Sequence, residues 1–255
     1  MLSEHSLWTA LALSASLVLA ATGACMAATS RLRQYPFFFS YATLQVLRSL
    51  IELALRGNSY QSYRIYFGFY WTAEAVIVLL NFAVLYEVAR SVLRPYPSLP
   101  PWVRALPLHA VGAVAALGIV FASLQTVTDP SWIVARILIL ETIARFAQAT
   151  LLLLLFALAA FFRLQWKHLS LGIALGFGLY ACVCLAAVAM RGHFGPRQDF
   201  IFALINSLAY NCACVIWLAY AFQRESAPVT TKIAPQRAEL KLADWNRALG
   251  GLLRR

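Results

Sequence analysis

The most constraining feature of the chain is residues 132–162, an apolar run in which charged side chains are embedded. A run of about 20 apolar residues is long enough to cross the hydrocarbon core of a bilayer as a helix. Its first half nevertheless carries Arg136, Glu141 and Arg145. A charge near the bilayer centre costs roughly 2.5–3.5 kcal/mol on insertion scales, so such residues normally face partners or a wet cavity. This run therefore predicts a membrane helix that turns a charged face towards the inside of a bundle.

The rest of the chain has the same character. Of its 255 residues, 62% are hydrophobic and 12% are charged, which is about half the charged fraction of an ordinary soluble domain. We predict an all-α fold, a polytopic membrane bundle formed by residues 1–224. Its seven transmembrane helices are expected at about 7–28, 36–56, 65–89, 107–125, 132–162, 171–190 and 200–222.

The basic residues predict the orientation of this bundle. The first apolar run has no Lys or Arg before it and is followed by Arg31 and Arg33, so its N-terminus is expected outside. With that orientation, fourteen Lys and Arg residues fall on the inner side and four on the outer side. An aromatic belt is expected to place Trp8 and Trp132 at the outer boundary, and Trp102, Trp166 and Trp217 at the inner one.

Residues 225–255 are predicted to form a cytoplasmic linker and a tail helix. Apolar residues recur there at helical spacing, opposite polar ones, which indicates an amphipathic helix. Such a helix lies on the membrane surface or docks onto a cytoplasmic protein partner, and both alternatives stay open. The apolar positions are Leu242, Trp245, Leu249 and Leu252.

Polar residues at helical spacing in four of the expected spans predict one shared network in the outer half of the bundle. Such a network either fixes helix register alone, or lines a pocket in which arginines hold a small anionic ligand. Which arginine faces Glu74 is left open by the spacing. The candidate network and binding residues are Arg48, Glu52, Tyr70, Glu74, Glu141, Arg145, Asn206 and Tyr210.

Several function classes are disfavoured by what the spans lack. The three lysines, Lys167, Lys232 and Lys241, all lie outside the spans, so no retinal Schiff base is expected. The four histidines lie at span ends or in loops, which disfavours haem, a buried zinc site and intramembrane hydrolysis. The net charge of +11 resides mainly in loops and the tail, which disfavours nucleic-acid binding. We expect no cofactor, no metal and no enzymatic activity.

Two resemblances accompany these patterns. YEVAR at 86–90 and NSLAY at 206–210 are generically similar to elements of receptor-type seven-helix proteins. YPFFFSY at 35–41, the stretch 87–97 and WNRAL at 245–249 resemble a group of uncharacterised bacterial seven-helix proteins, which implies a bacterial inner membrane. We therefore expect a non-enzymatic sensor or small-ligand-binding protein. A small-solute or proton-coupled transporter and a structural subunit of a membrane complex are the alternatives.

Overall fold

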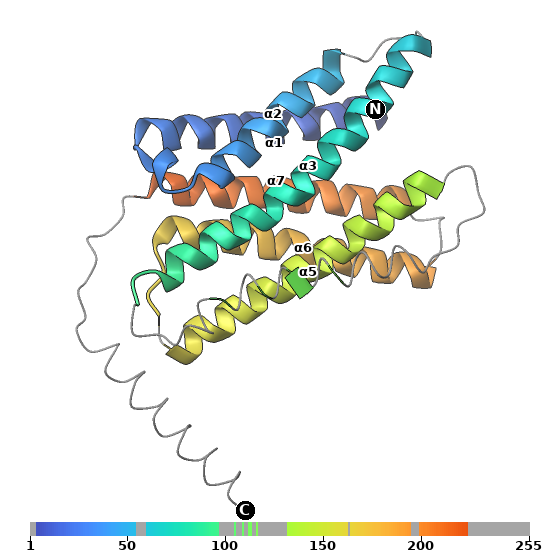
Figure 1. Ribbon diagram of the computed structural model, residues 1–255. Coiled ribbons are helices and arrows are strands. Elements are labelled where there is room, and N and C mark those ends of the chain that lie inside the picture. The colour runs from blue at the N-terminus through green and yellow to red at the C-terminus, as the bar shows by residue number, and fades with distance from the viewer. Residues whose placement is uncertain are drawn as a thin grey trace, which may run out of the picture.

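The computed structural model describes residues 4–54, 60–96, 105, 109, 112–113, 116, 132–162, 164–194 and 199–223. The side chains of 4–6, 60–67, 132–142, 191–194 and 199 are outside this description. All regular elements in these ranges are helical, as predicted (Figure 1). They are α1 (Glu4–Ala28), the 3-10 helix η1 (Arg31–Arg33), α2 (Pro36–Ala54), α3 (Tyr60–Leu93), α5 (Trp132–Phe162), α6 (His168–Phe194) and α7 (Asp199–Phe222).

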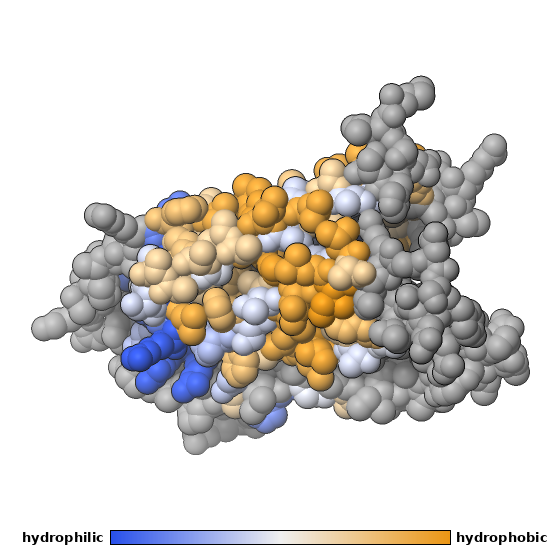
Figure 2. Space-filling model, turned by 90° about the horizontal axis from the view of Figure 1, so that it is seen from above, coloured by the Kyte–Doolittle hydropathy of each residue, from blue (hydrophilic) through white to orange (hydrophobic). Residues whose placement is uncertain are grey.

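Five of these helices are long and apolar enough to cross a membrane: α1, α3, α5, α6 and α7. Their outer faces carry exposed large apolar side chains, including Leu17, Leu79 and Leu153. Since lipid rather than water suits such a surface, these helices are compatible with an integral membrane protein. On the face seen in Figure 2, apolar residues cover the middle of the described surface.

Two of the seven expected spans are not among these five. α2 has 19 residues, carries Arg48 and Glu52, and is not among the helices that are both long and apolar enough to span. The expected span 107–125 is described only at 109, 112–113 and 116, and the tail helix lies outside the described residues. The number seven and the tail helix therefore stay predictions.

The directions of the helices constrain the path of the chain. α3 and α5 run the same way along the bundle (Figure 1). Asn81 lies near Arg145, and the later Val92 packs near Phe162, as expected of two parallel helices. The end of α3 and the start of α5 therefore lie at opposite ends of the bundle.

The start of α2 is capped by a carboxylate from another helix. Pro36 occupies the first helical turn, where its missing N–H is no loss. The carboxylate of Glu87 on α3 accepts the next two N–H groups, those of Phe37 at 3.1 Å and Phe38 at 3.0 Å. A negative charge at a helix N-terminus also complements the helix dipole. This contact fixes the position of α2 relative to α3.

The end of α7 is capped with the opposite charge. Buried Arg31 donates hydrogen bonds to the carbonyl oxygens of Ala221 at 2.8 Å and Gln223 at 2.6 Å. Cations are favourable at a helix C-terminus, where the last carbonyls lack partners within the helix. Arg31 therefore ties η1 to α7, in addition to its expected contribution to topology.

An aromatic cluster forms the centre of the bundle. The ring of Trp217 lies 5.4 Å from Phe38, 5.9 Å from Tyr41 and 4.8 Å from Phe177, measured between centroids. Trp217 is fully buried, and its indole N–H donates to the carbonyl oxygen of Ile173. The expectation that Trp217 belongs to the inner aromatic belt is therefore wrong. The side chain of Trp217 is turned into the bundle and not towards a membrane surface.

Small residues allow α6 and α7 to pack closely. A methyl group added at Gly172 would overlap the side chain of Tyr220, and one at Gly176 would overlap the indole of Trp217. The G-x-x-x-G spacing in α6 thus serves helix packing, as such spacings commonly do in membrane bundles.

Candidate functional site

A cavity of about 320 Å³, here called the bundle pocket, lies among α1, α2, α3, α5, α6 and α7. Its lining comes from residues 11–19 of α1, 70–81 of α3 and 206–211 of α7, and from the later part of α2. That it lies in the outer half of the bundle stays a prediction. Seven of the eight candidate residues line it: Arg48, Glu52, Tyr70, Glu74, Arg145, Asn206 and Tyr210. The eighth, Glu141, has its side chain outside the described part of the structure.

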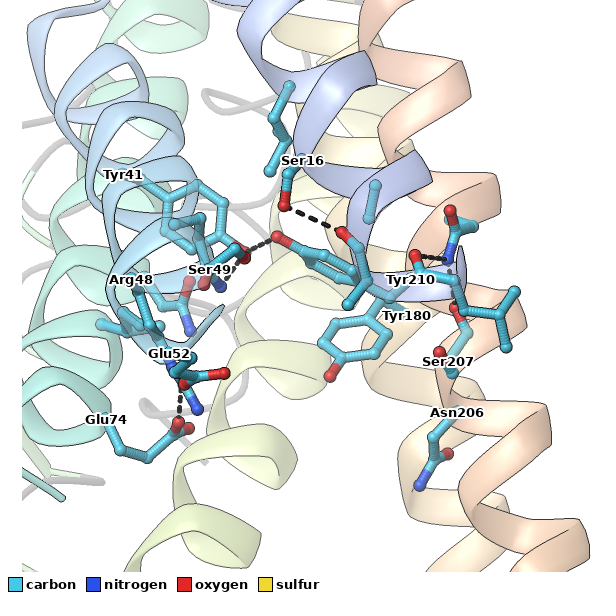
Figure 3. A pocket seen from close by; sticks show the side chains of 18 of the residues that line it. Ser16, Tyr41, Arg48, Ser49, Glu52, Glu74, Tyr180, Asn206, Ser207 and Tyr210 are labelled. Atoms are coloured by element: carbon cyan, nitrogen blue, oxygen red, sulfur yellow. Dashed lines mark hydrogen bonds and ion pairs between the residues drawn. The ribbon is translucent and has the colours of Figure 1, made fainter. Parts of the chain in front are cut away.

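Arg48 joins the acidic residues on one wall of the bundle pocket (Figure 3). Its Nε lies 2.7 Å from Oε1 of Glu52 on the same helix, and its Nη1 lies 2.5 Å from Oε2 of Glu74 on α3. The guanidinium carbon also lies 4.6 Å from the centroid of the Tyr70 ring. One guanidinium therefore bridges two carboxylates and stacks on an aromatic face, which fixes all four side chains.

A second arginine enters from α5. The guanidinium carbon of Arg145 lies 4.5 Å from the centroid of the Tyr180 ring, a cation–π contact. Tyr180 in turn packs edge-on against Tyr210 at 5.2 Å between centroids. The expected pairing of Arg145 with Glu141 stays a prediction, because the Glu141 side chain is not described.

Three asparagines of the bundle pocket differ in the hydrogen bonds that their side-chain amides make. Asn211 on α7 is well satisfied, since its Oδ1 accepts a hydrogen bond from Ser14 at 2.7 Å and its Nδ2 donates to the carbonyl oxygens of Leu11 and Ser207. The buried Oδ1 atoms of Asn81 and Asn206 have no hydrogen-bond partner among the described residues. Buried amide oxygens are normally hydrogen-bonded, so these two are acceptors suited to a bound polar molecule.

Helical spacing alone missed part of the lining. Spans one and six are apolar in sequence, yet α1 contributes Ser16 and α6 contributes Tyr180 (Figure 3). A lone polar residue in an apolar helix forms no stripe, so only the packing of the helices reveals its place. Ser49 on α2 was missed for a similar reason, because it is adjacent to the Arg48 stripe and not on it.

The lining of the bundle pocket combines charged, hydroxyl and amide groups. Two arginines and two glutamates of the described lining balance in formal charge, and hydroxyl and amide groups surround them. Over the described ranges, no three His, Cys, Asp or Glu side chains gather in a way that could hold a metal ion. The arrangement can bind a small molecule through charge-assisted and neutral hydrogen bonds.

Comparison with known protein families, with curated proteins and with solved structures finds no match to this chain. The chemistry of its own residues is therefore the basis for assigning a function.

Proposed function

We propose that the chain is a seven-span bacterial inner-membrane protein whose bundle pocket binds a small polar ligand, making it a non-enzymatic sensor or binding protein. The observation that carries this proposal is the gathering of charged, amide and hydroxyl side chains from six helices around one cavity. Its volume of about 320 Å³ lies at the lower end of the range of small-molecule pockets. Polar groups inside a membrane bundle are costly, which favours a functional role.

The two arginines have different roles in this proposal. Arg48 is held by Glu52 and Glu74, so it organises the wall of the bundle pocket. Arg145 stacks on Tyr180 and lines the same cavity, so its positive charge borders the space that a ligand would fill. The ligand is therefore a small molecule with an anionic group near Arg145.

The ligand also carries hydrogen-bond donors. The amide oxygens of Asn81 and Asn206 are acceptors that line the same cavity. A hydroxy acid or an amino acid combines an anionic group with donors of this kind.

The proposed topology is supported by helix direction. Because α3 and α5 run the same way, the segment 97–131 returns between opposite ends of the bundle, as a further span would. Together with α2 this makes seven crossings. The excess of basic residues on one side then places the N-terminus outside and the C-terminus in the cytoplasm.

A cysteine-accessibility experiment tests this proposal. Ser49, which lines the bundle pocket, is changed to Cys in a chain whose five native cysteines are replaced by Ala. Thr150→Cys is the matched control, because Thr150 is exposed on the outer face of α5. A hydrophilic, membrane-impermeant thiosulfonate added outside should modify Cys at 49 and leave Cys at 150 unmodified, since thiolates do not form in lipid.

The side of the membrane from which Cys at 49 is modified distinguishes a sensor or binding protein from a transporter. Modification of position 49 from the outside only is expected for a sensor or binding protein. Modification from both sides would favour the transporter reading. No modification from outside would contradict an open pocket.

A second arm tests the ligand class. Hydroxy acids and amino acids are screened for protection of Cys at 49, and at least one should slow its modification. Arg145→Gln should abolish that protection, whereas Arg191→Gln, which removes a charge near the end of α6, should leave it intact. Equal loss of protection in both variants would contradict a role for Arg145 in binding.

A further inference from the structure

A second cavity lies at the opposite end of the bundle, where α2 begins and α3 ends. Its volume is about 600 Å³, and we call it the inner cavity. Figure 2 shows strongly hydrophilic residues gathered towards this end of the described surface. Four exposed basic side chains line the inner cavity, drawn from η1, α3 and the segments beside α3 and α6: Arg33, Arg90, Arg94 and Lys167.

Glu87 is the acidic residue of this lining, and it already has partners. Both of its oxygens accept N–H groups at the start of α2, from Phe37 and Phe38. Among the described side chains, no carboxylate forms an ion pair with any of the four basic residues. With four basic side chains and one carboxylate in its described lining, the inner cavity has an excess of positive charge.

The floor of the inner cavity is rigid. Ser91 donates its hydroxyl hydrogen to the carbonyl oxygen of Val88 at 2.9 Å. Its 2.6 Å contact with Ser170 must then be donated by Ser170, whose own 2.6 Å contact with Tyr35 is donated by Tyr35. This chain of hydroxyls joins Tyr35, which directly precedes α2, to Ser91 on α3 and Ser170 on α6, beside the basic residues of the inner cavity.

The rim of the inner cavity is aromatic. Phe37 and Tyr86 both line it, and they are 44% and 40% exposed. Basic groups beside exposed aromatic rings at the end of membrane-length helices suit a ligand with an anionic head and an apolar body.

From these observations we infer that the inner cavity binds a phosphate group, which Arg90 and Arg94 hold together with Arg33 and Lys167. Arginine forks match phosphate oxygens in a bidentate manner. The aromatic rim indicates an anionic phospholipid of the cytoplasmic leaflet as the source of that phosphate, and the negative potential of this leaflet favours such binding. This inference does not depend on the ligand proposed for the bundle pocket.

The test measures the thermal unfolding midpoint of the purified full chain in detergent against added phosphatidylglycerol, phosphatidylcholine or glycerol 3-phosphate. Phosphatidylglycerol should raise the midpoint, and phosphatidylcholine should have little effect. Arg90→Gln with Arg94→Gln should raise the half-saturating concentration of phosphatidylglycerol about tenfold or more. The charge-matched control, Arg191→Gln with Arg197→Gln, should leave it within about twofold. Arg191 lies near the C-terminal end of α6 and Arg197 follows that helix, whereas Lys167 of the inner cavity directly precedes the start of α6.

Each other outcome is informative. Equal stabilisation by glycerol 3-phosphate and by phosphatidylglycerol would support a phosphate site with a soluble source. Equal weakening in both double variants would show diffuse charge attraction and overturn the inference, as would equal stabilisation by the two lipids. If Arg90→Gln with Arg94→Gln does not fold, Arg90→Lys with Arg94→Lys is measured instead. The lysines keep the positive charge but lack the two-pronged guanidinium, so an unchanged half-saturating concentration of phosphatidylglycerol would exclude bidentate binding.

Discussion

Two glutamates on α3 face α2 and satisfy their charges in different ways. Glu74, in the bundle pocket, pairs with the guanidinium of Arg48. Glu87, in the inner cavity, accepts backbone N–H groups of Phe37 and Phe38. A side-chain partner cancels formal charge, whereas a helix N-terminus supplies only partial charge. In the described lining of the bundle pocket, two arginines face two glutamates and the charges balance, whereas four basic side chains face Glu87 in the inner cavity and leave it cationic.

This difference separates the ligands that the two cavities suit. The bundle pocket, with its paired charges and amide oxygens, favours a small polar molecule that makes several hydrogen bonds. The inner cavity, with basic residues that have no described carboxylate partner, favours a phosphate. Three substitution experiments test whether the two glutamates behave as differently as their contacts indicate.

The largest effect is expected from Arg48→Gln, which leaves Glu52 and Glu74 without their shared counter-charge. The side chain of Glu74 is only 11% exposed, so the loss should be about 3 kcal/mol of unfolding free energy. Chemical denaturation in detergent measures it. Arg48→Gln combined with Glu74→Gln should cost less than the sum of the single changes, by about 1 kcal/mol or more.

A distant pair is the control for that coupling. Glu74→Gln combined with Arg94→Gln, at the other end of the bundle, should be additive within about 0.5 kcal/mol. Additivity in both pairs would contradict the ion pair as a stabilising contact.

A smaller effect is expected from Glu87→Gln, which replaces two charge-assisted acceptors at the start of α2 by one neutral amide oxygen. The expected loss is about 2 kcal/mol. Because the partners are backbone groups, no side-chain substitution should restore the stability. Glu87→Gln combined with Arg90→Gln should therefore be additive in denaturation experiments. Strong coupling in this pair would mean that Glu87 forms an ion pair, and the inner cavity would then be less cationic than we infer.

The smallest effects are expected from two tyrosines. Tyr35→Phe removes a buried hydroxyl that donates at 2.6 Å to Ser170, and should cost about 1 kcal/mol. Tyr41→Phe removes a hydroxyl whose contacts with Tyr210 and Gln45 are long, at 3.4 and 3.3 Å, and should cost less than about 0.5 kcal/mol. Thermal unfolding of the two variants gives the comparison directly. A larger loss for Tyr41→Phe would indicate that the bundle pocket, and not the inner cavity, has the more rigid polar network.

Much of the fold follows from local sequence patterns. Apolar runs of membrane length identify α1, α3, α5, α6 and α7, because a helix must cover about 30 Å of hydrocarbon with apolar side chains. The helical period also places Arg48 and Glu52 on one face of α2, since residues four apart lie one above the other. Both residues line the bundle pocket.

Contacts between helices needed the tertiary structure. Spacing along α3 predicts the face on which Glu74 lies, but its partner depends on how α2 is rotated and shifted against α3. In the sequence, Arg31 indicates topology and Glu87 belongs to the short motif at 86–90. Only the packed bundle shows that Arg31 caps α7 and that Glu87 caps α2. Trp217 illustrates the same limit. Its position near the end of an apolar run predicts an aromatic belt, but its side chain is buried inside the bundle.

The sequence by itself determined the helical class, the apolar segments and the face of each helix that carries charge, because these depend on interactions over a few residues and on the cost of charge in lipid. The tertiary structure decided which faces meet, and so it decided that Arg48 bridges Glu52 and Glu74 while Glu87 caps α2. Partner choice depends on helix rotation and crossing, which are set by side-chain volumes from the whole bundle. Close packing of Trp217 against Gly176 is one such determinant, and no single segment contains it.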